Sequence, residues 1–327
     1  MISVGDVSVR QDVAYQISPR HLVAAGMELH RLDTSVGFTS AGDRNPNEAN
    51  GSSIQGGAGL PDKLDSRLNG TRGGLWLQDT YTPSSRVSFE PGLRLDWSTV
   101  NGGTTLSPRL AGSYVLGRGA RIRAAGGLYT QSPGYEKLTQ SDYFIDLSGA
   151  REFELRHEKA THVVIGVEQE LPGDLSARVE GYYKRFDDLL VGRLETEAER
   201  VARIARYDFP AELRESLHPD DVEAVLDSVP TAPLIVSAPT NDAGGDAYGL
   251  DVFLMHTNTV APLTGWLSYA WGRANRESYA RRYAFEYDRR HAFNAVGRYR
   301  LTSRWDVAAT VRVASGFPHT APIGLRV

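Results

Sequence analysis

Alternation of apolar and polar residues is the main pattern along this chain. From Val87 to Trp97, the odd-numbered positions are Val, Phe, Pro, Leu, Leu and Trp, and the even-numbered positions are Ser, Glu, Gly, Arg and Asp. A period of two places these two sets on opposite faces of a β-strand. The same alternation recurs in 120–131, 162–171, 175–184 and 305–315. Less regular segments near 4–16, 20–32, 71–82, 105–116, 247–258, 264–275 and 288–301 bring the prediction to about twelve strands.

The connections between these strands alternate between short and long. The short ones have the Pro, Gly, Asp or Ser residues of tight turns, as in Pro83-Ser84-Ser85 and Gly117-Arg118-Gly119. The long ones span about 33–70, 99–104, 132–157, 188–246 and 276–287. This order is typical of an up-and-down membrane barrel, which has turns at one rim and longer loops at the other.

A soluble β-sandwich or a large soluble sheet is the alternative explanation of alternating strands. Such a sheet has to cover its apolar face with a second layer, and the sequence offers few helices for that purpose. The predicted strands of about 11–13 residues also exceed the usual soluble length and suit tilted membrane spans. The predicted fold is therefore all-β: an antiparallel up-and-down transmembrane β-barrel portion, with short turns on one rim and long loops on the other.

The long connection 188–246 differs from the others because part of it has helical spacing. Ala198, Val201, Ile204 and Ala205 fall on one helical face, and Pro219 stands where a second helix would begin. We predict a long extracellular loop with short helices. It is either a structured lid over a pore or a solvated insertion.

Composition excludes several classes of protein and site. No segment approaches the roughly 20 apolar residues of a membrane helix. The net charge is −4 without a basic tract, so no nucleic acid is expected as a partner. The chain has 0 cysteines, which excludes thiolate chemistry. His157 and His162 are predicted to face opposite ways on one strand, so no metal site is expected, and no cofactor is predicted.

Charged and tryptophan side chains receive separate predictions. We expect charges on the polar strand faces to line or brace a polar interior: Arg94, Arg121, Arg123, Arg178, Glu180 and Arg312. We expect the tryptophans to form an aromatic belt at the membrane boundary: Trp76, Trp97, Trp266, Trp271 and Trp305. None of these residues forms a nucleophile–base arrangement, and an enzyme is not predicted.

Seven segments, in order, resemble the barrel of TonB-dependent outer-membrane receptors. They are Leu75–Tyr81 (LWLQDTY), Phe89–Asp96 (FEPGLRLD), Leu106–Leu110 (LSPRL), Gly126–Pro133 (GGLYTQSP), Glu180–Leu189 (EGYYKRFDDL), Tyr287–Asn294 (YDRRHAFN) and Ala314–Thr320 (ASGFPHT). His319 stands in the last segment where the family usually has tyrosine. The resemblance implies a barrel of about 22 strands closed by an N-terminal plug. It also implies a TonB-type energy-transducing complex that acts through the plug.

The chain departs from that plan in having about twelve predicted strands. Residues 1–327 are therefore expected to be a partial receptor barrel in the bacterial outer membrane, with the plug domain and the C-terminal strands missing. The TonB-type complex would then be a partner only through the missing plug, and outer-membrane lipid would surround the barrel.

The predicted function is import of a scarce small extracellular ligand, such as a siderophore, vitamin or glycan. Candidate ligand-binding residues are aromatic and arginine side chains of two long loops: Tyr135, Tyr143, Phe144, Arg281, Arg282, Tyr283 and Tyr287. Ordinary loop packing or the aromatic girdle is the other explanation of these residues. Two alternatives to a receptor remain open. One is a complete 12-stranded outer-membrane channel or lipase-like barrel enzyme, and the other is a soluble β-rich binding module.

Overall fold

The strands form a single antiparallel sheet in chain order. The computed structural model describes residues 2–39, 63–134, 147, 150–205, 231–233, 235–258 and 261–318. Its sheet has 13 strands, of which twelve follow one another in sequence and β11 pairs only with β10. The elements are β1 Ile2–Ser18, β2 His21–Thr39, β3 Lys63–Ser84, β4 Val87–Ser98, β5 Thr104–Gly117, β6 Ala120–Gln131, β7 Glu158–Leu171, β8 Leu175–Leu194, α1 Glu197–Ala205, β9 Ile235–His256, β10 Leu263–Ser278, β11 Arg281–Ala284, β12 His291–Arg300 and β13 Asp306–Ala314.

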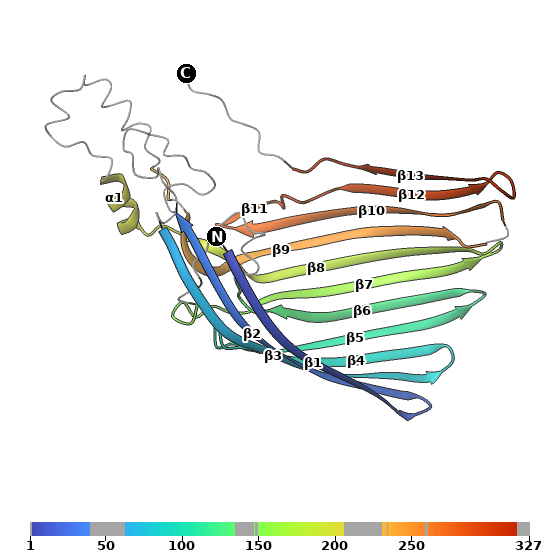
Figure 1. Cartoon of the computed structure of the whole chain (residues 1–327), viewed down its shortest axis with the longest axis horizontal. Helices are drawn as coiled ribbons and strands as arrows, with labels where there is room; N and C mark the ends of the chain where they lie inside the picture. The colour runs from blue at the N-terminus through green and yellow to red at the C-terminus, as the bar shows by residue number, and fades with distance from the viewer. Residues whose placement is uncertain are drawn as a thin grey trace, which may run out of the picture.

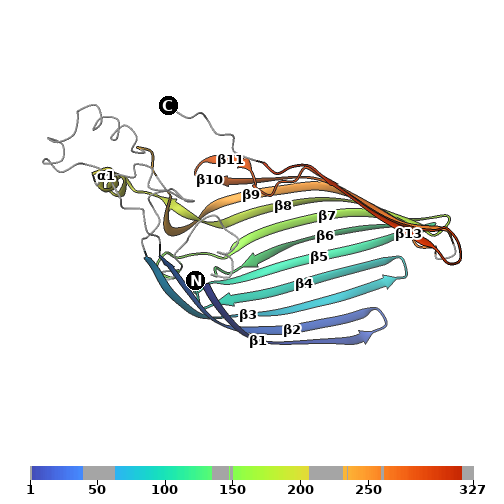
Figure 2. The same cartoon turned by 45° about the horizontal axis from the view of Figure 1, so that its top comes forward.

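The sheet is a curved wall whose two rims differ (Figures 1 and 2). The turns β1–β2, β3–β4, β5–β6, β7–β8, β9–β10 and β12–β13 lie at one rim, and α1 and the two-residue β10–β11 turn lie at the other. Among the described residues, β1 pairs only with β2 and β13 only with β12. The predicted antiparallel, up-and-down order and the alternation of connections are confirmed.

Several strands extend further toward the long-connection rim than the apolar pattern predicts. β2 runs to Thr39, β3 starts at Lys63, β8 runs to Leu194 and β9 starts at Ile235. The connection predicted as 188–246 therefore covers only 195–234. Backbone pairing between β8 and β9 continues past the apolar segment through three register shifts, from Phe186 to Leu194. The ladder persists although the apolar–polar alternation is broken there, because main-chain hydrogen bonds do not depend on that alternation.

Helix α1 lies within the segment that was predicted to be helical. The second helix predicted near Pro219 falls outside the described residues. No helix in the described part of the chain has the length and apolar character needed to cross a membrane.

Within the described part of the chain, no second layer covers the apolar face of the wall. Val7 is 73% exposed and Ile165 59% exposed, and other large apolar side chains of the same face are similarly open. The few buried apolar side chains are grouped at the long-connection rim: Leu32, Val100, Leu147, Ala150, Leu155, Val191 and Ala243. This is the distribution of a sheet with a lipid-facing side and no interior of its own.

Candidate functional site: the polar inner face and the long-loop rim

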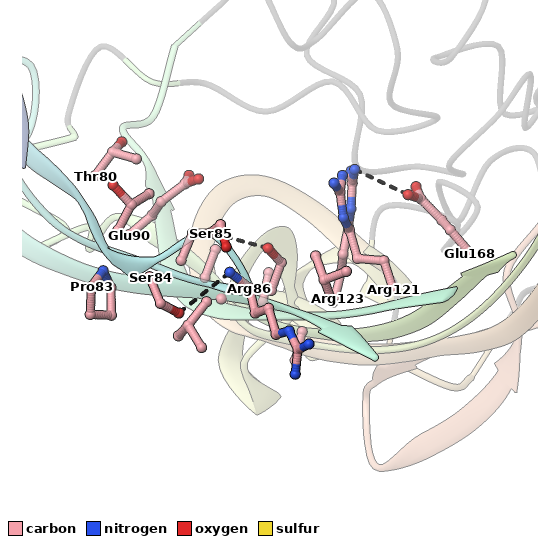
Figure 3. Close-up of a pocket in the computed structure, with 18 of the residues that line it drawn as sticks. Thr80, Pro83, Ser84, Ser85, Arg86, Glu90, Arg121, Arg123 and Glu168 are labelled. Carbon is pink, nitrogen blue, oxygen red and sulfur yellow. Dashed lines mark hydrogen bonds and ion pairs between the residues drawn. The ribbon is translucent and has the colours of Figure 1, made fainter. Parts of the chain in front are cut away.

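Strand register brings the polar positions of neighbouring strands onto one face. Arg94 of β4 is opposite Ser107 of β5, and Glu168 of β7 is opposite both Arg121 of β6 and Arg178 of β8. A period of two keeps this parity along each strand, so the polar residues form one continuous surface. Figure 3 shows Glu90, Arg121, Arg123 and Glu168 on the same side of the sheet. We call this surface the inner face.

Ion pairs connect strands across the inner face. Arg94 contacts Glu28 of β2 and donates from Nε to Asp96 Oδ1 at 2.8 Å. Arg123 Nη2 lies 3.1 Å from Glu168 Oε2 on the next strand. The predicted bracing of a polar interior is confirmed for Arg94 and Arg123, which both link different strands.

The other predicted lumen charges also lie on this face. Arg178 Nε is 3.2 Å from Glu180 Oε2 within β8. Arg121 points into the hollow beside Arg123 (Figure 3). Arg312 of β13 is opposite Asn294 of β12 and is exposed.

A hollow with a volume of about 1030 Å³ lies at the short-turn end of the inner face. Its lining comes from six strands, β3 to β8, and includes both arginines and glutamates: Glu90, Arg121, Arg123, Glu168, Arg178 and Glu180. Mixed charges of this kind favour contact with a polar surface or an aqueous path over an apolar ligand.

Two of the five tryptophans contradict the predicted belt. Trp76 is opposite Gly26 and Arg94 and lies beside Asp12, so it is on the inner face. Trp266 stacks on Phe253 at 6.0 Å, and Phe253 is opposite Arg178. Trp266 is therefore on the inner face as well. Trp97, Trp271 and Trp305 fall on the apolar face, as predicted.

The predicted Arg/aromatic cluster at the long-connection rim divides into two parts. Arg281–Ala284 is strand β11, which folds back on Asn275–Ser278. Arg282 donates from Nη2 to Asp246 Oδ1 at 2.6 Å, and the Tyr283 hydroxyl is 2.9 Å from Ser278 Oγ. These two side chains hold the hairpin against β9 and β10, which satisfies their polar groups within the protein.

Arg281 and Tyr287 are exposed, and neither side chain has a hydrogen bond or ion pair among the described residues. Arg281 borders a hollow of about 550 Å³ together with Asp187, Asp188 and Asp242. Tyr287 is 61% exposed. Its ring lies 6.1 Å from Phe317, and the Arg289 guanidinium covers Phe317 at 4.4 Å.

The apolar–polar pattern does not identify Arg289 and Phe317 as members of this group. Arg289 falls in the Tyr287–Asn294 segment and Phe317 in the Ala314–Thr320 segment, and both segments resemble the receptor family. Tyr135, Tyr143 and Phe144 lie outside the described residues.

The prediction that His157 and His162 lie on the same strand is wrong for His157. This residue is buried and precedes β7, and its Nδ1 is 3.2 Å from Thr105 Oγ1. His162 lies within β7, with its ring 4.6 Å from that of Tyr129.

Helix α1 is fixed beyond the rim by charged residues. Thr196 and Glu199 form a capping box: the Thr196 amide donates to Glu199 Oε2 at 2.8 Å, and the Glu199 amide donates to Thr196 Oγ1 at 3.3 Å. Arg193 donates to both oxygens of Glu199 at 2.6 Å. Hydrogen bonds from Arg193 and then from the Thr196 amide lower the pKa of Glu199 to about 2.

Comparison with known proteins gives one family and a consistent set of folds. The family model described as "TonB dependent receptor-like, beta-barrel" matches residues 5–316. No curated protein matches the chain.

Solved structures share the fold at low sequence identity. The FrpB iron transporter from Neisseria meningitidis is 12% identical with a TM-score of 0.62, over 95% of this chain and 42% of that one. The siderophore receptor PirA from Pseudomonas aeruginosa is 12% identical with a TM-score of 0.59, over 96% of this chain and 48% of that one. The outer membrane transporter YddB from Escherichia coli is 11% identical with a TM-score of 0.55, over 91% and 40%. The chain thus spans less than half the length of each.

Proposed function

The chain belongs to the TonB-dependent receptor-like β-barrel family, and we propose on that basis that it forms part of the wall of a receptor that imports a scarce ligand. Its location is the bacterial outer membrane, as for the family. The family and the similar structures are receptors and transporters rather than enzymes.

One observation carries the proposal: a polar inner face runs along a wall whose other face is apolar and exposed. Arg94 and Arg123 brace that inner face between strands. A soluble protein has no use for an uncovered apolar sheet of this size, whereas a barrel in lipid requires one. The hollow of about 1030 Å³ at the short-turn end supports a role in enclosing another part of the same receptor or a polar path. A plug domain elsewhere in the protein, acting with a TonB-type complex, would supply the energy coupling.

Ligand capture is assigned to the long-connection rim. Arg281 and Tyr287 carry this part of the proposal because they are exposed and no described hydrogen bond or ion pair engages their side chains. Arg282 and Tyr283 support the hairpin and have an indirect role. Tyr135, Tyr143 and Phe144 stay candidates from the sequence. The iron and siderophore cargo of FrpB and PirA makes a ferric siderophore the first ligand to test.

The function is tested with the whole protein that contains this chain. It is produced in a receptor-deficient Gram-negative strain, and uptake of a radiolabelled ferric siderophore is measured with and without an active TonB complex. TonB-dependent accumulation is the expected result. Accumulation that persists without TonB would indicate a passive channel and contradict the proposal. A labelled vitamin and a labelled glycan fragment extend the test to other cargo, and absence of TonB-dependent uptake for all three also counts against it.

The rim is tested by Arg281→Ala and Tyr287→Ala. Either change should weaken binding of the transported probe to the purified receptor by about tenfold, because truncation of an Arg or Tyr anchor typically costs more than 1 kcal/mol. Arg304→Ala, an exposed arginine at the opposite rim, is the control and should leave this affinity unchanged.

A further inference from the structure

Arginines occupy the short turns at one rim of the wall. Four of the six short connections contain one: Arg20 between β1 and β2, Arg86 between β3 and β4, Arg118 between β5 and β6, and Arg304 between β12 and β13. All four residues are exposed. In the part of the chain that the structure describes, no ion pair involves any of these guanidinium groups. Arginines on the inner face, such as Arg94 and Arg123, have carboxylate partners instead.

The turns themselves do not require arginine. In three of them a hydroxyl two residues earlier accepts the arginine's backbone N–H: Ser18 for Arg20 at 3.2 Å, Ser84 for Arg86 at 3.3 Å and Thr302 for Arg304 at 3.2 Å. These turns therefore depend on the hydroxyl and leave the arginine side chain unused. Arg118 has a φ of 52°, a left-handed conformation in which Gly, Asn or Asp is favoured. Turn geometry thus does not explain the choice of residue.

The first three turns stand next to the apolar face. Exposed Ile17 is three residues before Arg20, exposed Phe89 three residues after Arg86, and exposed Leu116 two residues before Arg118. Arg20 and Arg86 contribute to the border of the hollow, and Figure 3 shows the Arg86 guanidinium on the opposite side of the sheet from Arg121 and Arg123.

Among the carboxylates near this rim, Glu90 and Glu168 lie on the inner face, Asp79 has the parity of the exposed Leu77 on the apolar face, and Asp174 lies in the β7–β8 turn. Glu90 and Glu168 point to the same side as Arg121 and Arg123 (Figure 3). Near this rim, the exposed Arg20, Arg86 and Arg118 therefore lie in the turns, at the edge of the wall, and have no ion pair among the described residues, whereas ion-paired Arg123 lies on the inner face. In a bilayer, that edge coincides with the layer of lipid headgroups.

We propose that Arg20, Arg86 and Arg118 bind the phosphate groups of anionic phospholipids in the leaflet at the short-turn rim. Successive turns are two strands apart, which is about 10 Å, so each guanidinium can contact a different headgroup. A guanidinium binds phosphate through paired N–H groups, and basic residues close to an anionic leaflet are attracted to it. The inference depends on insertion in the membrane and is independent of which ligand, if any, the receptor imports.

The test counts lipids retained by the whole receptor. The purified protein is reconstituted in nanodiscs of phosphatidylethanolamine with or without phosphatidylglycerol, and bound lipid is measured by native mass spectrometry after release. The unmodified receptor should retain phosphatidylglycerol in preference to phosphatidylethanolamine. Each Arg→Gln change should lower that preference about fivefold, and Arg20→Gln/Arg86→Gln/Arg118→Gln together should lower it by up to about a hundredfold.

Matched variants separate this site from a general effect of charge. Arg121→Gln removes an exposed arginine at the same height on the inner face and should leave the preference intact. The triple Arg→Lys variant keeps the charges and should retain most of the preference. Thermal unfolding of every variant establishes that it is folded before lipid is counted.

Three results would overturn the proposal. The first is an unchanged phosphatidylglycerol preference in the folded triple Gln variant. The second is an equal loss in Arg121→Gln. The third is displacement of the bound lipid by millimolar inorganic phosphate, which would indicate a site for free anions. Failure of siderophore uptake would leave this result unaffected.

Discussion

Glycines in this wall make room for large side chains from neighbouring strands. A Cβ on Gly73 of β3 would lie 2.3 Å from the Trp97 ring of β4. At Gly26 of β2 it would lie 2.4 Å from both Asp12 Oδ1 and Trp76 Nε1. The first pair is on the apolar face and the second on the inner face. In both places a residue without a side chain lets an indole lie flat across the adjacent strand.

Substitution of Gly73 tests this role. Gly73→Val forces the Trp97 ring away and should reduce the free energy of unfolding by about 1–3 kcal/mol, as overpacking does in well-packed sites. Gly297→Val in β12 is the control, because a Cβ there meets nothing within 4 Å. Both changes raise β-propensity equally, so urea unfolding of the reconstituted protein isolates the steric effect. Equal stabilities of the two variants would contradict the assignment.

Even and odd positions along a strand point to opposite faces, and this explains which side chains were assigned to the correct face from the sequence. Arg94, Arg123 and Arg178 alternate strictly with apolar neighbours, so their face could be predicted. Trp76 lies in an apolar run between Leu75 and Leu77, and its hydrophobicity suggested the lipid face. Its parity with Arg72 and Gln78 already indicated the inner face. The register then brings it beside Asp12, a contact between strands far apart in sequence that no local pattern specifies.

At the scale of elements, strand cores were predictable and their extensions were not. Apolar alternation identifies the part of a strand that faces lipid. Beyond it, β8 and β9 pair through a mixed sequence without regular alternation, with three register shifts and Asp188 at a φ of 57°. The β10–β11 hairpin was missed because its turn uses Tyr279 and Ala280, at φ of 52° and 57°, where sequence rules expect Asn-Gly. The arrangement of the candidate site at the rim depends on this turn. The sequence therefore predicted which residues belong to the site but not how they are arranged.

The Asn241 amide ties the extended β8–β9 hairpin to the β6–β7 connection, beside an ion pair in which Arg156 Nη2 lies 2.9 Å from Asp188 Oδ1. Asn241 Nδ2 donates to the Asp188 carbonyl at 2.6 Å and to the Arg156 carbonyl at 3.2 Å, and Asn241 Oδ1 accepts from the Arg156 amide at 2.8 Å. Asn241→Ala leaves these buried backbone groups without partners, which costs about 1–3 kcal/mol. Amide exchange of residues 155–157 should accelerate at least fivefold. Asn69→Ala, at an exposed site on β3, should not change it.

Helix α1 should respond to acid through Glu199. The folded pKa of about 2 is below the ordinary value of 4.5, so the stabilisation is present above pH 4.5 and is lost as the pH falls toward 2. Protection factors of the α1 amides should therefore fall between pH 5 and 2. Thr196→Ala should reduce protection at neutral pH, since removal of an N-cap costs about 1 kcal/mol. In Glu199→Gln most of the pH dependence should disappear; if it persists, Glu199 is not its source.

At the scale of the whole molecule, the two faces of the wall determine what surrounds it. Ile165 and Val164 are adjacent in β7, at the same height, and point to opposite sides. Ile165 is 59% exposed on the apolar face, and Val164 borders the hollow of the inner face. In a bilayer, Ile165→Lys places a charge in lipid and should lower folding stability by about 2–4 kcal/mol. Val164→Lys faces a polar interior and should cost less than about 1 kcal/mol.

The measurement is urea unfolding of the whole protein in vesicles. A soluble sheet would give the opposite order, because it would tolerate lysine at the exposed Ile165 and lose contacts at the half-buried Val164. The sign of this difference therefore decides between a membrane wall and a soluble sheet, whichever ligand the receptor binds.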